Sequence, residues 1–233
     1  MGGKRSGEKR SAVSVRALGA STGAGGDEGG GERVGDARPA SHGTRDRLVG
    51  AMSDALQRRG LRGVGIAELL DRADAPRGVL YHHFPGGKDQ LAVAAIQSTV
   101  ARLSDALDRL TASKADPAEV LGAWWADAAL RLERSGFERG CPLATVALET
   151  SGEDRDLRHS LALGFAAIRD RLAATFVEAG LSAGRAEPLA ALVVAAYEGA
   201  LMQARVAGDT TPMADAGRAL VRLARAELNA EAP

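Results

Sequence analysis

Apolar side chains recur at helical spacing from residue 44 onward, and this pattern predicts the secondary structure. The segment 44–59 carries its apolar residues on one face, which predicts an amphipathic helix that ends at Gly60. Thr44 is expected to cap its N-terminus. The apolar face consists of Leu48, Met52, Ala55 and Leu56.

Two short helices follow this first one. The segment 65–75 turns Ile66, Leu69 and Leu70 inward, and the segment 76–84 begins at a proline that suits a first helical turn. Pro-Gly-Gly at 85–87 ends the third helix. Two short helices joined by a tight turn and supported by a longer one match a helix-turn-helix, whose second short helix enters the DNA major groove.

The rest of the chain carries longer helical patterns. No segment alternates apolar and polar residues as strands do, so the predicted fold class is all-α, with about nine helices. An N-terminal three-helix DNA-binding domain with the helix-turn-helix, over 44–92, would precede a C-terminal helical domain over 93–233. The rear helices are expected at 88–110, from Pro117, from about Pro142, and at 154–179, 185–207 and 212–229.

Residues 1–43 differ from everything that follows. Twelve of them are glycine, and almost no periodic apolar face is present. Such a segment cannot bury enough apolar surface to offset its ordering entropy, so we predict a disordered N-terminal arm. Two interpretations stay open: a basic arm that contacts DNA phosphates, and a passive tail.

Charge and cysteine content narrow the setting of the protein. Lys and Arg together number 30, as do Asp and Glu, but residues 44–92 hold eight basic against six acidic residues, and 93–233 hold fifteen against nineteen. The asymmetry weakly favours a nucleic-acid partner at the front. The single cysteine excludes an intrachain disulfide and fits a cytoplasmic location. No apolar run approaches the roughly 20 residues of a membrane helix, so no membrane partner is expected.

The stretch "LYHHF" at 80–84, followed by Lys88 and Leu91, carries a family resemblance. Over about 44–96 the chain resembles the DNA-binding domain of TetR/AcrR transcriptional regulators. The linker "PGGK", "GCPLATVALE" at 140–149 and "YEGALMQAR" after it resemble the LmrA/YxaF branch of that family.

The resemblance implies which residues contact DNA. Arg77 can pair with guanine or hold a phosphate, Val79 can touch a thymine methyl group, and Tyr81 offers a hydroxyl suited to phosphate oxygens. The adjacent histidines point about 100° apart on a helix and lack further ligands, so no metal site and no cofactor are expected. The candidate DNA-binding residues are Arg77, Gly78, Val79, Tyr81, His82, His83 and Lys88.

By the same resemblance, the rear domain would bind a small-molecule effector and form a homodimer. The expected ligand-binding residues are Leu121, Trp124, Trp125, Phe137, Cys141, Thr145, Phe165, Ile168 and Tyr197. The expected dimer interface consists of Leu192, Ala196, Ala200, Leu201, Ala204, Leu220 and Leu223. Cys141 could sense oxidants, but without a second cysteine a structural thiol is favoured.

These features predict a ligand-responsive transcriptional regulator. It would be a repressor that binds a palindromic double-stranded DNA operator as a dimer and is released by a small apolar effector. A ligand-independent regulator or an activator of the same fold stays open. An all-α enzyme is disfavoured, because no catalytic constellation is present; Glu149, Glu153, Asp154 and His159 are interpreted as a solvated turn.

Overall fold

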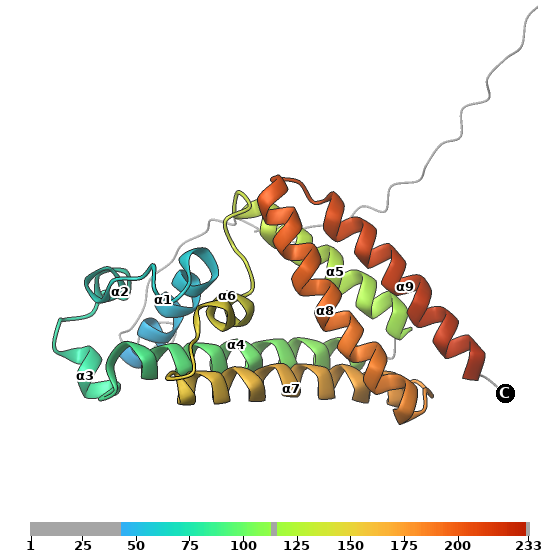
Figure 1. Cartoon of the computed structure of the whole chain (residues 1–233), viewed down its shortest axis with the longest axis horizontal. Helices are drawn as coiled ribbons and strands as arrows, with labels where there is room; N and C mark the ends of the chain where they lie inside the picture. Colours follow the sequence, from blue (N-terminus) through green and yellow to red (C-terminus); the bar gives the residue numbers. More distant parts are fainter. Residues whose placement is uncertain (1–42, 113–115, 232–233) are drawn as a thin grey trace, which may run out of the picture. The chain divides into compact units, whose positions relative to one another are not determined.

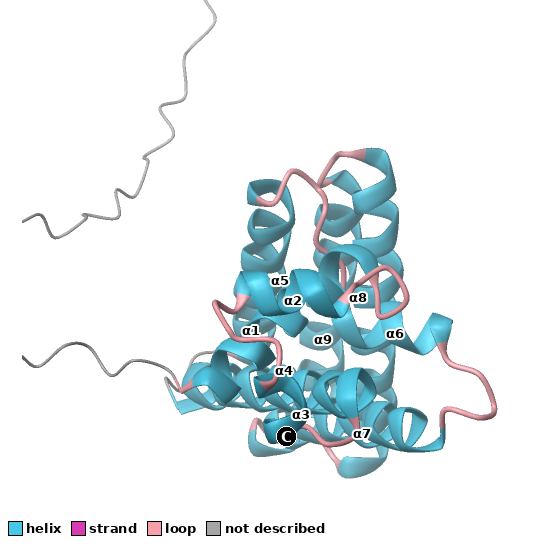
Figure 2. Ribbon diagram, turned by 90° about the vertical axis from the view of Figure 1, so that its left-hand side faces the viewer, coloured by secondary structure: helices cyan, strands magenta, loops and turns pink. Residues whose placement is uncertain are grey.

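The computed structural model describes residues 43–112 and 116–231, and all regular secondary structure within them is helical (Figure 2). The all-α prediction is therefore confirmed. The predicted N-terminal arm lies, except for its last residue, outside the described residues. The helices are α1 (Thr44–Arg59), α2 (Ile66–Arg72), α3 (Val79–His83), α4 (Gly87–Ala112), α5 (Pro117–Arg134), α6 (Pro142–Glu149), α7 (Arg155–Glu178), α8 (Ala183–Ala207) and α9 (Thr211–Glu231).

Helix α1 supports the two short helices that follow it. Its apolar face is buried, as the spacing predicts, and Gly60 ends it with a positive φ of 71°. The cap prediction was wrong: Gly43 occupies the N-cap position, and Thr44 is the first helical residue. Helix α3 is also shorter than predicted, because Pro76 begins a turn, closed by the Val79 N–H, rather than the helix.

Helix α4 joins the front of the described chain to its rear. It starts beside α3 and runs alongside α7, while α8 packs on α7, and α9 packs on α5 and α8 (Figure 1). The boundary predicted between residues 92 and 93 falls inside this continuous helix. A division of the chain there would therefore leave α4 shared between both parts.

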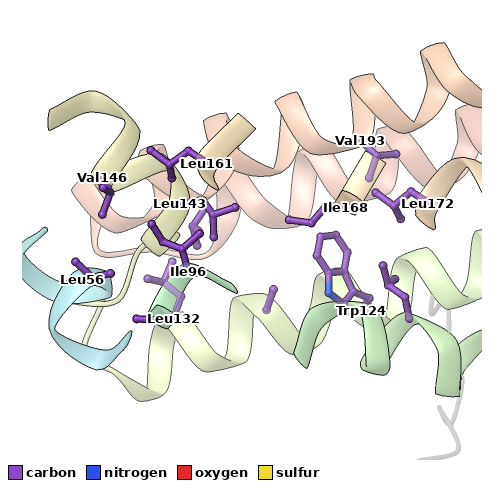
Figure 3. Packing of buried hydrophobic residues seen from close by; sticks show 14 of the residues in the cluster. Leu56, Ile96, Trp124, Leu132, Leu143, Val146, Leu161, Ile168, Leu172 and Val193 are labelled. Carbon is purple, nitrogen blue, oxygen red and sulfur yellow. The ribbon is translucent and has the colours of Figure 1, made fainter. Parts of the chain in front are cut away.

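Helix α6 packs where the front and rear helices meet. Its Leu143 and Val146 lie close to Leu56 of α1, Ile96 of α4 and Leu161 of α7 (Figure 3). All five side chains are buried, and the apolar cluster continues from α1 through to α9. One core therefore connects the three front helices α1–α3, termed the recognition unit, with the rear helices.

Helix α8 is long and apolar enough to cross a membrane by length and composition, with a mean hydropathy of 1.3 over its most apolar window. The expectation that no segment approaches that length was therefore wrong. The helix packs against α7 and α9 through Leu189, Val193 and Ala204, as a core helix does.

Candidate nucleic-acid interface and cavity

Two apolar side chains anchor the recognition helix α3. Leu80 and Phe84 are only 1% and 2% exposed, and both belong to the core around α1. The guanidinium carbon of Arg45 lies 5.3 Å from the centre of the Phe84 ring, a cation–π arrangement that adds a second contact from α1. The rear face of α3 is therefore fixed, and its other face is left to solvent.

Arg47 holds the turn between α2 and α3. Its Nε donates to the carbonyl of Ala73 at 2.8 Å, and its Nη2 donates to the carbonyl of Asp74 at 3.1 Å. Asp74 adopts a positive φ of 46°, which non-glycine residues seldom do. The side chain from α1 thus stabilises a turn conformation that sets the direction of α3.

The residues predicted to contact DNA lie on α3, in the turn before it and at the start of α4. Tyr81 is 56% exposed, and Arg77, Gly78 and His82 are exposed as well. The remaining three predicted residues, Val79, His83 and Lys88, are partly buried. The two histidine rings lie edge to face with centroids 5.1 Å apart. Among the described residues, no group of three His, Cys, Asp or Glu side chains is placed to hold a metal ion.

A cavity of 680 Å³ lies among α4, α5, α6, α7 and α8. One wall is aromatic: the Trp124 and Tyr197 rings stack with centroids 4.7 Å apart and planes inclined by 29°. Ile168, Leu201 and Leu143 complete the apolar lining from α7, α8 and α6. Its size and composition are those of a small-molecule site.

Three titratable groups meet inside the cavity. Burial raises the pKa of the Glu198 carboxyl above its ordinary value. Burial, and secondarily the nearby Glu198, raises the pKa of the Cys141 thiol far above its ordinary range. Burial raises the pKa of Tyr197 in the same way. Near neutral pH the thiol form of Cys141 is thus favoured over the reactive thiolate, which fits a structural thiol.

The structure brings four of the nine predicted ligand-binding residues to this cavity: Trp124, Cys141, Ile168 and Tyr197. Five others do not line it. Trp125 points instead toward α9, where its indole N–H donates to the carbonyl of Met213. Thr145 donates its hydroxyl to the carbonyl of Cys141 at 2.8 Å. The remaining three, which pack in the apolar core, are Leu121, Phe137 and Phe165.

Sequence reasoning missed the contribution of α4 and the buried acid. On α4, residues 99, 102, 103, 106 and 109 line the cavity at spacings of three and four, a signal that the sequence contains. Glu198 gave no such signal, because it sits in an apolar segment of α8. The missed lining residues are Gln57, Thr99, Arg102, Leu103, Ala106, Arg109, Ala123, Asp127, Arg131, Leu132, Arg139, Gly140, Pro142, Leu143, Val194, Glu198 and Leu201.

The residues predicted for a dimer interface divide into two groups. Leu192 is 46% exposed, Leu223 is exposed and Ala196 is partly buried. Leu201 is 5% exposed and lines the cavity. Three more of the predicted interface residues are buried within the chain itself: Ala200, Ala204 and Leu220.

Helix α6 is hydrogen-bonded to the recognition unit near both of its ends. Before its N-terminus, the Gly140 N–H donates to the carbonyl of Gln57 at 2.8 Å. At its C-terminus, Glu149 Oε2 accepts from the N–H of Leu61 at 2.6 Å and of Arg62 at 3.2 Å. Glu149 is therefore not part of a solvated turn, as the sequence suggested, but joins α6 to the α1–α2 loop.

Comparison with known proteins decides the family. Residues 51–95 match the family "Bacterial regulatory proteins, tetR family", and residues 117–219 match "Transcriptional regulator LmrA/YxaF-like, C-terminal domain". A relative in Mycobacterium tuberculosis (strain CDC 1551 / Oshkosh), an uncharacterized HTH-type transcriptional regulator, is 33% identical over 80% of this chain and 96% of its own length. The chain belongs to the TetR family.

Other TetR-family proteins agree with this assignment. The regulator LmrA of Bacillus subtilis is 26% identical over 73% of this chain and 90% of its own length. The crystal structure of a TetR protein from Rhodobacter sphaeroides superposes with a TM-score of 0.70 at 26% identity, covering 77% of this chain and 97% of that one. The protein is thus a transcriptional regulator of the TetR family and not an enzyme.

Proposed function

We propose that this TetR-family protein is a cytoplasmic repressor that binds a palindromic DNA operator as a homodimer and is released by a small-molecule effector. One observation carries the proposal: Arg77 in the turn before α3, and Tyr81 and His82 on α3, are exposed, while Leu80 and Phe84 anchor the opposite face in the core. An exposed helix with a firmly held rear face is what major-groove recognition requires. Arg77 would contact a base edge or a phosphate, and Tyr81 a phosphate.

An apolar stripe along α8 supports the homodimer. Leu192, Met202 and Val206 are exposed at positions that share one face of α8, and Leu223 of the neighbouring α9 is exposed as well. Gly199 lies on the same stripe and adds no side chain to it. A second copy packed on this stripe would place two recognition helices in one assembly, as a palindromic operator demands.

The cavity would bind the effector, and α6 would transmit its presence. Cys141 and Leu143 at the beginning of α6 line the cavity, while Glu149 at its end holds the α1–α2 loop. An effector that binds the DNA-free arrangement more tightly than the DNA-bound one shifts the population toward release. The proposal requires no contact between effector and DNA.

A gel-shift titration against DNA from upstream of the protein's own gene tests operator binding. We expect tight, salt-sensitive binding. Replacing Arg77 by alanine should weaken it by about 10- to 100-fold, as loss of a base or phosphate contact does. Tyr81→Phe should weaken it less, since only the hydroxyl is lost. The control, Arg169→Ala, removes an exposed arginine of α7 and should leave binding unchanged.

Absence of any shift at low salt, with a folded dimer and with random-sequence selection also failing, would refute the proposed DNA binding. Unchanged affinity in both Arg77→Ala and Tyr81→Phe would refute the assignment of α3 and the turn before it as the segment that contacts DNA.

A further inference from the structure

The opening of the cavity is rich in arginine. Arg102 and Arg109 extend from α4, Arg131 from α5, and Arg139 from the segment before α6; all four are exposed and all four line the cavity. Trp124, Leu143 and Leu201 of the apolar wall are buried, so the arginines form the more solvent-exposed part of the lining.

Two of these arginines are already paired with acids. Arg131 forms an ion pair with Asp127 on the same helix, and Arg139 forms one with Asp54 of α1. Their positive charge is therefore largely compensated within the chain.

The two arginines of α4 are not compensated in this way. Arg102 donates to neutral hydroxyls, that of Ser98 at 2.8 Å and that of Thr99 at 3.1 Å. Within residues 43–112 and 116–231, neither Arg102 nor Arg109 forms an ion pair with a carboxylate. Seven positions separate them, so they lie on one face of α4 about two turns apart. Guanidinium groups so placed match the oxygen atoms of a carboxylate, sulfonate or phosphate.

The acid inside the cavity is not paired with these two arginines. Among the described residues, Glu198 forms no ion pair with Arg102 or Arg109, and its side chain is hydrogen-bonded to Cys141. Burial raises the pKa of its carboxyl group, because the charged form is less well solvated there than in water. Charge complementarity therefore favours a negatively charged ligand group at the entrance.

We propose that the cavity binds an amphipathic anion, with its acidic group at Arg102 and Arg109 and its apolar body against the Trp124–Tyr197 stack. This inference rests on the proposed function of the cavity as the effector site and adds the charge of the effector. The volume of 680 Å³ accommodates an aromatic or acyl body of several rings or many carbons.

Three probes with one body and different charge test the proposal: 4-(1-pyrenyl)butyrate, the corresponding alcohol and the corresponding amine. Quenching of tryptophan fluorescence reports binding, since Trp124 forms the cavity wall and Trp125 neighbours it. We expect the carboxylate to bind about tenfold more tightly than the alcohol or the amine. The double variant Arg102→Gln, Arg109→Gln should remove that preference while keeping the affinity for the alcohol.

Arg169→Gln is the matched control, an exposed arginine that does not line the cavity, and it should leave all three affinities unchanged. Thermal unfolding checks that each variant is folded. The proposal is overturned by an amine that binds as tightly as the carboxylate, by no binding of any probe, or by a carboxylate preference that survives the double variant. Because the titration contains no DNA, it can succeed while operator binding fails, and the two proposals stand or fall separately.

Discussion

Replacing Glu149 by alanine should loosen the joint between α6 and the α1–α2 loop. The carboxylate accepts two backbone hydrogen bonds, from Leu61 at 2.6 Å and from Arg62 at 3.2 Å. Arg62 is exposed, so its N–H can bond to water once the carboxylate is gone. Leu61 is only 9% exposed, and its N–H would lose its partner with little access to solvent.

The expected loss follows from the Leu61 bond. A hydrogen bond to a charged acceptor contributes about 1.5–3 kcal/mol, and we take about 2 kcal/mol for this partly buried one. For a chain of this size, that loss lowers Tm by about 4–8 °C. Glu149→Gln keeps a carbonyl acceptor without the charge and should lose roughly half as much.

Thermal unfolding followed by circular dichroism measures the effect. The control is Glu153→Ala, an exposed carboxylate four residues further along, which should unfold like the parent protein. If Glu149→Ala unfolds at the parent temperature, the two hydrogen bonds contribute nothing and the joint is not as described. In the gel shift, the same variant should also show weaker effector-induced release at unchanged effector affinity, because the coupling and not the cavity is altered.

Three further predictions concern packing, protonation and assembly. Gly217→Ala would place its Cβ 2.6 Å from Trp125 Cδ1 and should lower the unfolding free energy by about 1–3 kcal/mol. Gly50→Ala, in open space on α1, should raise the unfolding free energy slightly. Urea unfolding of both variants and the parent protein measures these changes. Because burial raises the pKa of Glu198 above 4.5, the native state binds its proton more tightly than the unfolded chain, so stability falls as pH rises from 4.5 through the raised pKa. Glu198→Gln should therefore gain stability over the parent as pH rises through that window, and a gap that does not widen with pH would contradict this. Leu192→Asp should shift sedimentation from dimer to monomer, and an unchanged dimer would place the interface elsewhere.

The helices were predictable from the sequence because helical periodicity is a local property. The apolar face of α1 and the anchors Leu80 and Phe84 could be assigned from spacing alone. The cap at Gly43 could not, since Thr44 is an equally good capping residue and only the backbone geometry separates them.

The cavity was only partly predictable because its lining depends on which helices meet. Trp124 and Trp125 are equivalent by composition, yet one faces the cavity and the other faces α9. Their 100° separation shows that they diverge, but not which neighbour each one meets. The Glu149 contact with Leu61 joins residues 88 apart, and no local pattern marks such a pair.

The joint at α6 combines two kinds of interaction that respond differently to a shift of the helix. The apolar contacts of Leu143 and Val146 with Leu56 are non-directional, so they hold α6 in place over a range of small displacements. The bonds from the Leu61 and Arg62 amides to Glu149 depend on distance and angle and favour one position. Their loss costs a few kcal/mol, which is comparable to the differential affinity with which a ligand shifts a two-state equilibrium. Under the proposed mechanism, the core would keep the recognition unit attached in both arrangements, while the polar contact, small enough for an effector to overcome, would select between them.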